Sequence, residues 1–381
     1  MKHFVLFLSL CLIGGLLLSG CVAAGGTIKI GLQGPMTGDY ALEGQGFEKA
    51  VKLLVEQTNA AGGINGQKVE LLVEDDKGDP KEASLVADRL AAKKIIAVIG
   101  AYNSSATEPA SAIYNREGIL HITPSSTATR LTQKGYQNFF RTAFLDDRQG
   151  LFAAEFMTKV LNAKAIALLH DNSTYAQGLA EWTKKYLEER KANVVFYDAI
   201  NPKDTDFTAT LTKIKAANPD VIYFTGYYAQ GGLLLKQAPQ VGLKVQWIGG
   251  NAMNNPDLIK IAGIENAKGV YVTTEPLPGD LDYPEAKKFI ADYKAKYGSE
   301  PESVWTVMAA DAYRVIEQAI KATKSTDPKK LAEYLHKDFK NFPGITGPIL
   351  GFDEKGDRLG TIHKAYVINE KGEFVPNPKQ P

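Results

Sequence analysis

The sequence predicts an α/β protein built from two successive doubly wound, Rossmann-like modules. Two observations carry this prediction. Short apolar runs alternate with segments whose apolar residues recur at helical spacing, which is typical of a mostly parallel sheet with helices on both faces. This alternation runs from residue 27 to about residue 144 and starts again near residue 166. The length of 381 residues is enough for two domains with full cores.

In the first module the apolar runs predict four strands, at residues 28–32, 69–73, 95–99 and 118–122, and the same pattern starts again after residues 139–144. Apolar residues at helical spacing predict helices over 47–55, 83–90 and from Ser104 onward. Residues 75–80 contain three aspartates but lack the closing glutamate of a calcium loop, so we interpret them as a solvated turn.

In the second module the predicted strands lie at residues 166–169, 194–197, 221–224, 245–248 and 270–272. Asp146 to Arg148 mark the expected first crossing between the modules. Periodicity does not say which module the later elements join. They are helices at 286–297, 304–321 and 328–336, strands at 348–350 and 365–368, and a tail of little structure at 376–381.

The N-terminus predicts export. A basic start and a short apolar stretch over residues 4–18 indicate a signal peptide at 1–20 rather than a membrane span. Small residues before Cys21 are similar to a bacterial lipobox, which predicts a lipidated Cys21 and a leader at 21–26; an ordinary signal peptide is the alternative. Removal of residues 1–20 lowers the number of basic residues from 44 to 43, against 43 acidic ones. This balance gives no indication of nucleic-acid binding.

Signals for an enzyme are weak. The chain lacks a Gly-x-Ser-x-Gly elbow, a Walker loop and a His-Glu-x-x-His motif, and the expected mature chain has no free thiol. We therefore expect no cofactor, no metal and no catalysis. His170 and Asp171 at a strand end leave a hydrolase as a remote alternative, with a structural histidine favoured.

Residues 100–127 contain the best candidate for a binding site. Small hydroxylated residues follow two neighbouring strands, with Ser104 after one and Ser125, Ser126 and Thr127 after the other. The carboxyl ends of parallel strands are where open α/β sheets bind ligands, and a helix start at Ser104 suits an anion. Polar and aromatic residues also follow strands of the second module, at 171–175, 226–228 and 249–251. Together these loops predict one cleft between the modules.

At these residues the chain resembles the branched-chain amino-acid binding proteins of ABC importers, which have the type I periplasmic binding fold. The similar segments span nearly the whole expected mature chain: 30–38, 59–66, 75–80, 100–111, 128–141, 192–196 and 352–357. The resemblance implies two lobes joined by three crossovers. The first lobe would comprise 27–145 plus 276–352, and the second 146–275 plus 353–381.

The resemblance also implies residue roles. Ser104 and backbone N–H groups near Ser126 and Thr127 would hold a carboxylate. The Ser125 carbonyl, the Thr127 hydroxyl and Asp146 would hold an ammonium group, and Tyr175 and Tyr227 would close over the ligand from the second lobe.

Three departures from the family weaken the inference to leucine. Asn251 stands where relatives have an acidic residue, which implies one negative charge fewer in the second lobe. Glu43 stands where they have an aromatic residue; we favour a solvent-facing Glu43 over one that faces the ligand. The family's disulfide positions fall on Gly78 and Asn103.

The resulting expectation is a monomeric, exported, membrane-anchored lipoprotein that delivers an amino acid to the permease of an ABC importer. The alternative is a sensory or regulatory receptor for an amide or a small aromatic carboxylate.

Overall fold

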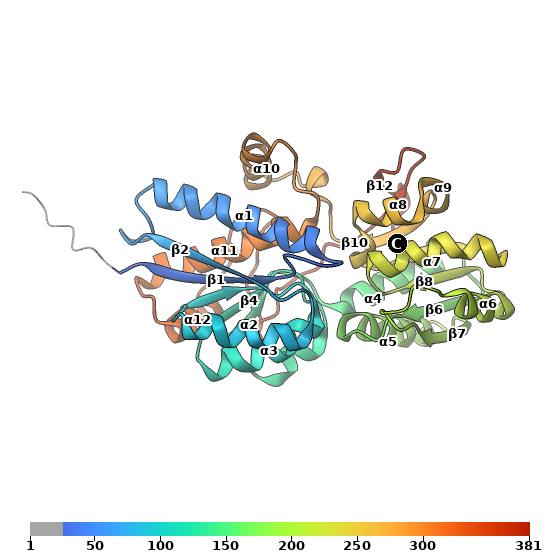
Figure 1. The fold of residues 1–381 in the computed structure, drawn as a ribbon, viewed down its shortest axis with the longest axis horizontal. Helices are drawn as coiled ribbons and strands as arrows, with labels where there is room; N and C mark the ends of the chain where they lie inside the picture. Colours follow the sequence, from blue (N-terminus) through green and yellow to red (C-terminus); the bar gives the residue numbers. More distant parts are fainter. Residues whose placement is uncertain (1–25) are drawn as a thin grey trace, which may run out of the picture.

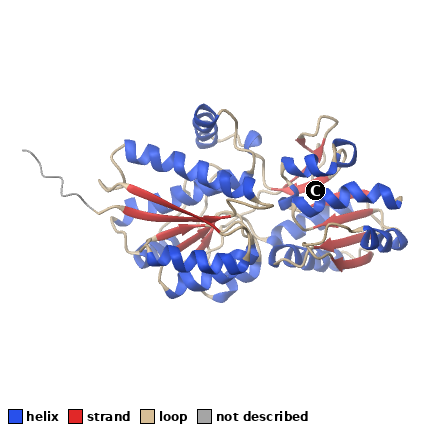
Figure 2. Cartoon of the chain, in the orientation of Figure 1, coloured by secondary structure: helices blue, strands red, loops and turns tan. Residues whose placement is uncertain are grey.

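The computed structural model describes residues 26–381 and divides them into two lobes that lie side by side along the long axis of the molecule (Figure 1). In each lobe a central sheet has helices on both faces (Figure 2). The expected signal peptide and Cys21 lie outside the described residues. Within the described part, none of the helices combines the length and apolar character needed to cross a membrane.

The sheet of the first lobe is parallel throughout. Its order is β2-β1-β3-β4-β5, from strands β1 (Ile28–Gly34), β2 (Val69–Asp75), β3 (Ala97–Ile99), β4 (Leu120–Thr123) and β5 (Phe139–Arg141).

The second lobe repeats this topology. Its sheet has the order β12-β11-β10-β9-β8-β6-β7, with strands β6 (Ile166–His170), β7 (Val194–Ala199), β8 (Val221–Phe224), β9 (Gln246–Gly249), β10 (Tyr271–Thr274), β11 (Lys364–Ile368) and β12 (Phe374–Pro376). Strands β6 to β10 are parallel and follow the same 2-1-3-4-5 order as the first lobe, and β11 and β12 add an antiparallel edge. Each sheet therefore has one switch point, between β1 and β3 or between β6 and β8, where a crevice forms at the carboxyl edge.

The helices divide between the lobes by their packing. In the first lobe they are α1 (Ala41–Ala60), α2 (Pro80–Ala92), α3 (Ser104–Arg116), α10 (Pro284–Tyr297), α11 (Val304–Thr323) and α12 (Pro328–Lys337). The last three belong there because α1 packs on both α11 and α10, and α12 packs on α11. The second lobe holds α4 (Asp146–Glu155), α5 (Thr174–Glu189), α6 (Thr208–Ala217), α7 (Tyr228–Gln237), α8 (Pro256–Ala262) and α9 (Ile264–Ala267). The late helices, which periodicity left unassigned, thus return to the first lobe.

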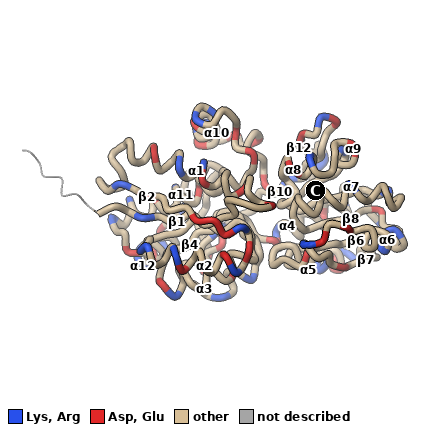
Figure 3. Tube along the Cα trace, in the orientation of Figure 1, with Lys and Arg blue, Asp and Glu red and all other residues tan. Residues whose placement is uncertain are grey.

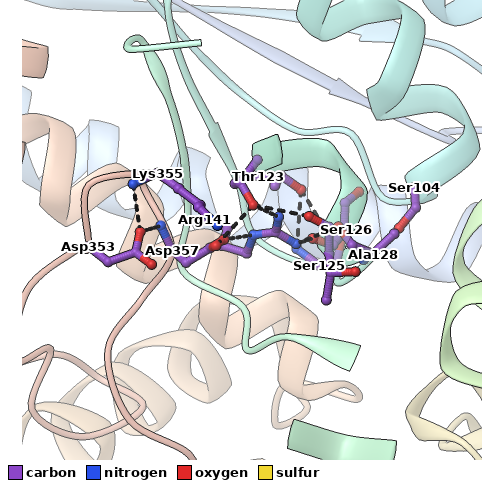
Figure 4. A network of polar contacts seen from close by, with 11 residues as sticks. Ser104, Thr123, Ser125, Ser126, Ala128, Arg141, Asp353, Lys355 and Asp357 are labelled. Atoms are coloured by element: carbon purple, nitrogen blue, oxygen red, sulfur yellow. Dashed lines mark hydrogen bonds and ion pairs between the residues drawn. The ribbon is translucent and has the colours of Figure 1, made fainter. Parts of the chain in front are cut away.

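The chain crosses between the lobes three times. It passes from β5 to α4, returns after β10, and crosses again before β11. The predicted boundary at residue 353 is too early, because the segment that follows it still packs on the first lobe. Asp357 forms an ion pair of 2.6 Å with the fully buried Arg141 of β5, and Arg358 donates to the Thr142 carbonyl at 3.0 Å (Figure 4).

Two other expectations for local structure are wrong. Residues 348–350 form only an isolated bridge, between Ile349 and Phe342, rather than a strand. Asp76, expected in a solvated turn, is fully buried and bonds Gln33, a distant partner that local pattern does not reveal. The tail has neither helix nor strand after Pro376, as expected, although the Gln380 side chain bonds both backbone groups of Ala365.

Charged residues of both signs are scattered over both lobes (Figure 3). Most of the ion pairs formed by the described residues are exposed, and such pairs contribute little to stability. The buried Arg141–Asp357 pair is of a different kind, because removing one partner leaves an uncompensated charge.

We therefore expect Arg141→Met to lower the free energy of unfolding by about 3–5 kcal/mol, measured by urea denaturation. The double variant Arg141→Met with Asp357→Leu should recover part of that loss, because no carboxylate is then left unpaired. Arg148→Met, which disrupts an exposed pair, serves as the control. A loss below about 1 kcal/mol in the Arg141 variant would contradict this assignment.

Candidate functional site

A small cavity lies between the lobes where the two switch points meet. Its lining comes from both lobes: Tyr102, Ser104, Ser125, Tyr175, Tyr227, Asn251, Ala252 and Trp305. These side chains nearly fill the space between them, which measures about 10 Å³. That is room for roughly one water molecule, so a larger ligand requires the lobes to part.

The N-terminus of α3 reaches this cavity from the first lobe. Asn103, the residue before the helix, makes no capping bond, whereas α2 and α5 are capped by the side chains of Asp79 and Ser173. Ser104, the first residue of α3, is 1% exposed, and its hydroxyl accepts from the Ala128 N–H at 3.4 Å. The hydroxyl can still donate a hydrogen bond of its own. Together with the uncapped N–H groups and the positive end of the α3 dipole, it forms a site that favours a carboxylate.

The loop after β4 is held rigidly behind the cavity (Figure 4). Arg141 donates to the carbonyl groups of Ser126 and Ala128 at 2.8 and 3.1 Å. The Ser126 N–H, predicted to help hold a carboxylate, donates instead to Thr123 Oγ1 at 3.1 Å. The Ser125 hydroxyl donates to the Tyr102 carbonyl at 3.0 Å. Ser126 thus supports the loop, while Ser125 also lines the cavity.

Thr127 and Asp146 lie near the cavity but, like Glu43, are absent from its lining. Thr127 Oγ1 and both carboxylate oxygens of Asp146 are buried without hydrogen-bond partners. The Asp146 N–H donates to the Thr127 carbonyl at 3.1 Å, which ties the start of α4 to the first-lobe loop. Burial raises the pKa of Asp146 to about 7, although Thr127 and Arg141 lower it. An unpaired buried carboxylate is costly, so this arrangement favours a cationic partner.

Tyrosines join the two lobes around the cavity. The ring of Tyr227 lies 4.8 Å from that of Tyr40 and 5.9 Å from that of Tyr102, both in the first lobe. Tyr175 lies 5.4 Å from Tyr227 within the second lobe. The Tyr228 hydroxyl donates to the Asp39 carbonyl at 2.6 Å. The lobes are therefore closed over the cavity, with Tyr175 and Tyr227 in its wall.

Asn251 also lines the cavity and leads to a carboxylate that sequence reasoning missed. Its Nδ2 lies 3.4 Å from Glu275 Oε2, and Glu275 is fully buried just after β10. Burial raises the pKa of Glu275 to about 7. The second lobe was expected to lack a negative charge at position 251. The Glu275 carboxyl group lies directly behind Asn251 in space.

Glu43 differs from the expectation of a solvent-facing residue. It is 1% exposed, and its Oε1 accepts from Asn255 Nδ2 of the second lobe at 2.9 Å. Burial raises the pKa of Glu43 to about 7, against hydrogen bonds from Ser303 and Asn255 that lower it. The helical pattern of α1 cannot reveal this contact, because Asn255 lies 212 residues away. Glu43 is an interlobe contact next to the cavity wall and is absent from the cavity lining itself.

Two aromatic residues of the wall, Tyr102 and Trp305, were not predicted. Tyr102 lies within the 100–127 stretch, three residues after β3, so attention to aromatic residues at strand ends would have found it. Trp305 opens α11 and reaches the cavity only because that helix returns to the first lobe. No local signal identifies it.

His170 and Asp171 stabilise local turns. His170 Nδ1 accepts from the Asn172 N–H at 3.2 Å, and Asp171 Oδ1 accepts from the Ser173 N–H at 2.9 Å. Neither side chain lines the cavity. Among the described residues there is also no cluster of three or more histidine, cysteine, aspartate or glutamate side chains suited to a metal ion.

Two lobes with three crossovers, closed over a small polar cavity, define a two-domain solute-binding protein. The chain belongs to the periplasmic binding protein family, whose profile matches residues 27–371. The predicted fold and the resemblance to branched-chain amino-acid binding proteins are confirmed.

The chain is similar to several proteins of that kind. It is 39% identical to the leucine-, isoleucine-, valine-, threonine- and alanine-binding protein of Pseudomonas aeruginosa, over 88% of each chain. A leucine-binding protein of Thermotoga maritima superposes with a TM-score of 0.85 at 31% identity, covering 92% of this chain and 99% of the other. A branched-chain amino-acid transporter substrate-binding protein of Streptococcus pneumoniae, solved with isoleucine, gives 0.82 and 32%, with coverage of 93% and 100%.

The placement of Glu43 predicts a pH-dependent effect on stability. A carboxyl group whose pKa is raised by folding destabilises the folded state as the pH rises from its unfolded pKa, near 4.5, to about 7. Glu43→Gln keeps an acceptor for Asn255 and cannot ionise. We expect it to raise stability at pH 8 by on the order of 1–3 kcal/mol and to change little at pH 4.5.

Thermal unfolding at the two pH values measures the difference. Glu302→Gln is the control, because Glu302 is exposed and close in sequence to Ser303. A stability change for Glu43→Gln that is the same at both pH values would contradict the buried placement of Glu43.

Proposed function

We propose that this protein captures an amino acid in the interlobe cavity and delivers it to the membrane permease of an ABC importer. The observation that carries the proposal is the unpaired, buried Asp146 carboxylate beside the unpaired Thr127 hydroxyl. On the first lobe, Ser104 and the uncapped start of α3 would hold the ligand's carboxylate. Asp146, Thr127 and the Ser125 carbonyl would hold its ammonium group.

Relatives support this assignment, since those named above bind leucine, isoleucine or valine. The second lobe would cover the ligand with Tyr175 and Tyr227. Capture and release require no bond to be made or broken, so the proposal includes no catalysis. Export is consistent with the family. Anchoring through a lipid on Cys21, and a monomeric state, remain part of the proposal and rest on the sequence.

The first test is a thermal-shift screen of the chain from residue 22 onward. We expect at least one amino acid to raise the melting temperature, because a ligand at 100 times its dissociation constant adds about 2.7 kcal/mol to stability. The screen should include benzoate-like acids and short amides. A shift with these compounds and none with any of the twenty amino acids would overturn the amino-acid assignment and favour the receptor for small carboxylates or amides.

A second test removes the charge proposed to meet the ammonium group. Asp146→Asn should weaken amino-acid binding by about 2–5 kcal/mol, because the ligand's ammonium loses a buried charged partner. Its melting temperature without ligand should be unchanged or higher, since the unpaired carboxylate is gone. Asp147→Asn is the matched control, because Asp147 is the next residue and pairs with the exposed Arg148. Calorimetric affinities that are equal for the two variants would contradict this role.

A further inference from the structure

Glu275 and Asn251 contact each other beside the proposed ammonium site, in which Glu275 has no assigned role. Asn251 lines the cavity, and Glu275 lies behind it with no exposed surface. Glu275 Oε2 accepts from Asn251 Nδ2 at 3.4 Å and from Thr274 Oγ1 at 3.3 Å. Glu275 Oε1 has no hydrogen-bond partner. This carboxyl group is therefore connected to the cavity through one amide.

An ionised carboxylate only accepts hydrogen bonds, so it fixes the orientation of a neighbouring amide. Asn251 must turn its NH₂ group toward Glu275. The amide oxygen then lies on the opposite side of the amide, toward the cavity that Asn251 lines. A carbonyl oxygen presented in this way accepts from an ammonium group and repels a second carboxylate.

Burial raises the pKa of Glu275 to about 7, against hydrogen bonds from Asn251 and Thr274 and the charge of Arg358, which lower it. The carboxyl group is therefore about half ionised at neutral pH, and a bound ammonium group favours its ionised form. His363 Nε2 lies 3.6 Å from Glu275 Oε1, and burial lowers the pKa of His363 to about 3, so the imidazole is neutral. His363 Nδ1 lies 2.9 Å from Thr361 Oγ1. If that nitrogen accepts from the hydroxyl, the proton of the ring sits on Nε2 and faces the carboxylate.

Asp146 approaches the same region from the start of α4. The charge of Glu275 raises the pKa of Asp146, so the two carboxyl groups oppose each other's ionisation. A cation between the lobes relieves that repulsion. A neutral or anionic ligand does not.

We propose that Glu275 is a positioning residue of the ammonium site, which turns the Asn251 amide oxygen toward the ligand and adds a second negative charge to the second lobe near Asp146. This inference rests on the proposed function and deepens it. It makes the site selective for ligands that carry a positive amine, and it replaces the acidic residue that relatives have at position 251.

The test compares two ligands that differ only in the amine. They are the amino acid with the largest shift in the screen and the same molecule with hydrogen in place of its ammonium group; for leucine the latter is 4-methylpentanoate. Glu275→Gln should weaken binding of the amino acid about tenfold, because glutamine carries no charge and no longer fixes the amide. Affinity for the deaminated acid should stay the same or rise.

Rescue separates positioning from a general structural role. In the double variant Asn251→Asp with Glu275→Gln, a carboxylate meets the ammonium directly, so amino-acid affinity should return to within about threefold of the wild type. Melting temperatures without ligand show whether each variant folds. If Glu275→Gln fails to fold, Asn251→Ala, which removes the amide that Glu275 positions, takes its place, and it should weaken the amino acid without weakening the deaminated acid.

The outcomes distinguish the two proposals. If the wild-type protein binds no amino acid, the proposed function is wrong and this inference falls with it. If the wild type binds one and Glu275→Gln weakens both ligands equally, or neither, only the positioning role is overturned. A double variant that is no better than Glu275→Gln has the same consequence.

Discussion

Closure of the two lobes buries carboxyl groups, and the free-energy cost of burying their charge opposes closure. Glu43, Asp146 and Glu275 lie at or beside the interface, and loss of water raises the pKa of each to about 7. Near neutral pH each group therefore opposes closure unless something compensates its charge. Asn255 offers Glu43 a hydrogen bond, and Asn251 offers one to Glu275, whereas Asp146 has no partner. The greatest gain from a bound cation is thus at Asp146.

Aromatic and backbone contacts act in the opposite direction. The close pair of Tyr40 and Tyr227 contributes about 0.5–1.5 kcal/mol beyond the area that it buries. The Thr174 N–H donates to Ser105 Oγ at 3.0 Å, and Trp182 Nε1 donates to Thr129 Oγ1 at 3.1 Å, across the same interface. Each such bond adds about 0.5–1.5 kcal/mol. These contacts favour closure and offset part of the cost of burying the three carboxyl groups, so a ligand that compensates their charge favours the closed lobes further.

The sequence predicts the scaffold well and the interface poorly, for a physical reason. Strand and helix periodicity is local, and it located most of the strands and long helices, including the loops that carry Ser104 and Thr127, but not α4, β5 or β12. Glu43 contacts Asn255, 212 residues away, and Glu275 contacts Asn251, 24 residues away on another loop. Trp305 reaches the cavity from a helix that returns to the first lobe. The residue type and its position mislead at Glu43, since a glutamate at the start of a helix usually faces solvent. Family resemblance supplied positions in the site, but it did not reveal the carboxyl group behind Asn251.

The two halves of the site differ in how they are formed, which bears on how a ligand is selected. The loop of the first-lobe half is held from within its own lobe, because Arg141 donates to the Ser126 and Ala128 carbonyls. In the proposed site, Tyr175, Tyr227 and Asn251 would reach the ligand when the second lobe closes. A carboxylate without an amine can bind the first half, but it leaves the buried charge of Asp146 uncompensated. In the proposed site such a ligand gains less free energy on closure than an amino acid does, so it shifts the equilibrium toward the closed form less. In the proposed function, the protein therefore discriminates between ligands with and without an amine when the lobes close, rather than when the ligand first binds.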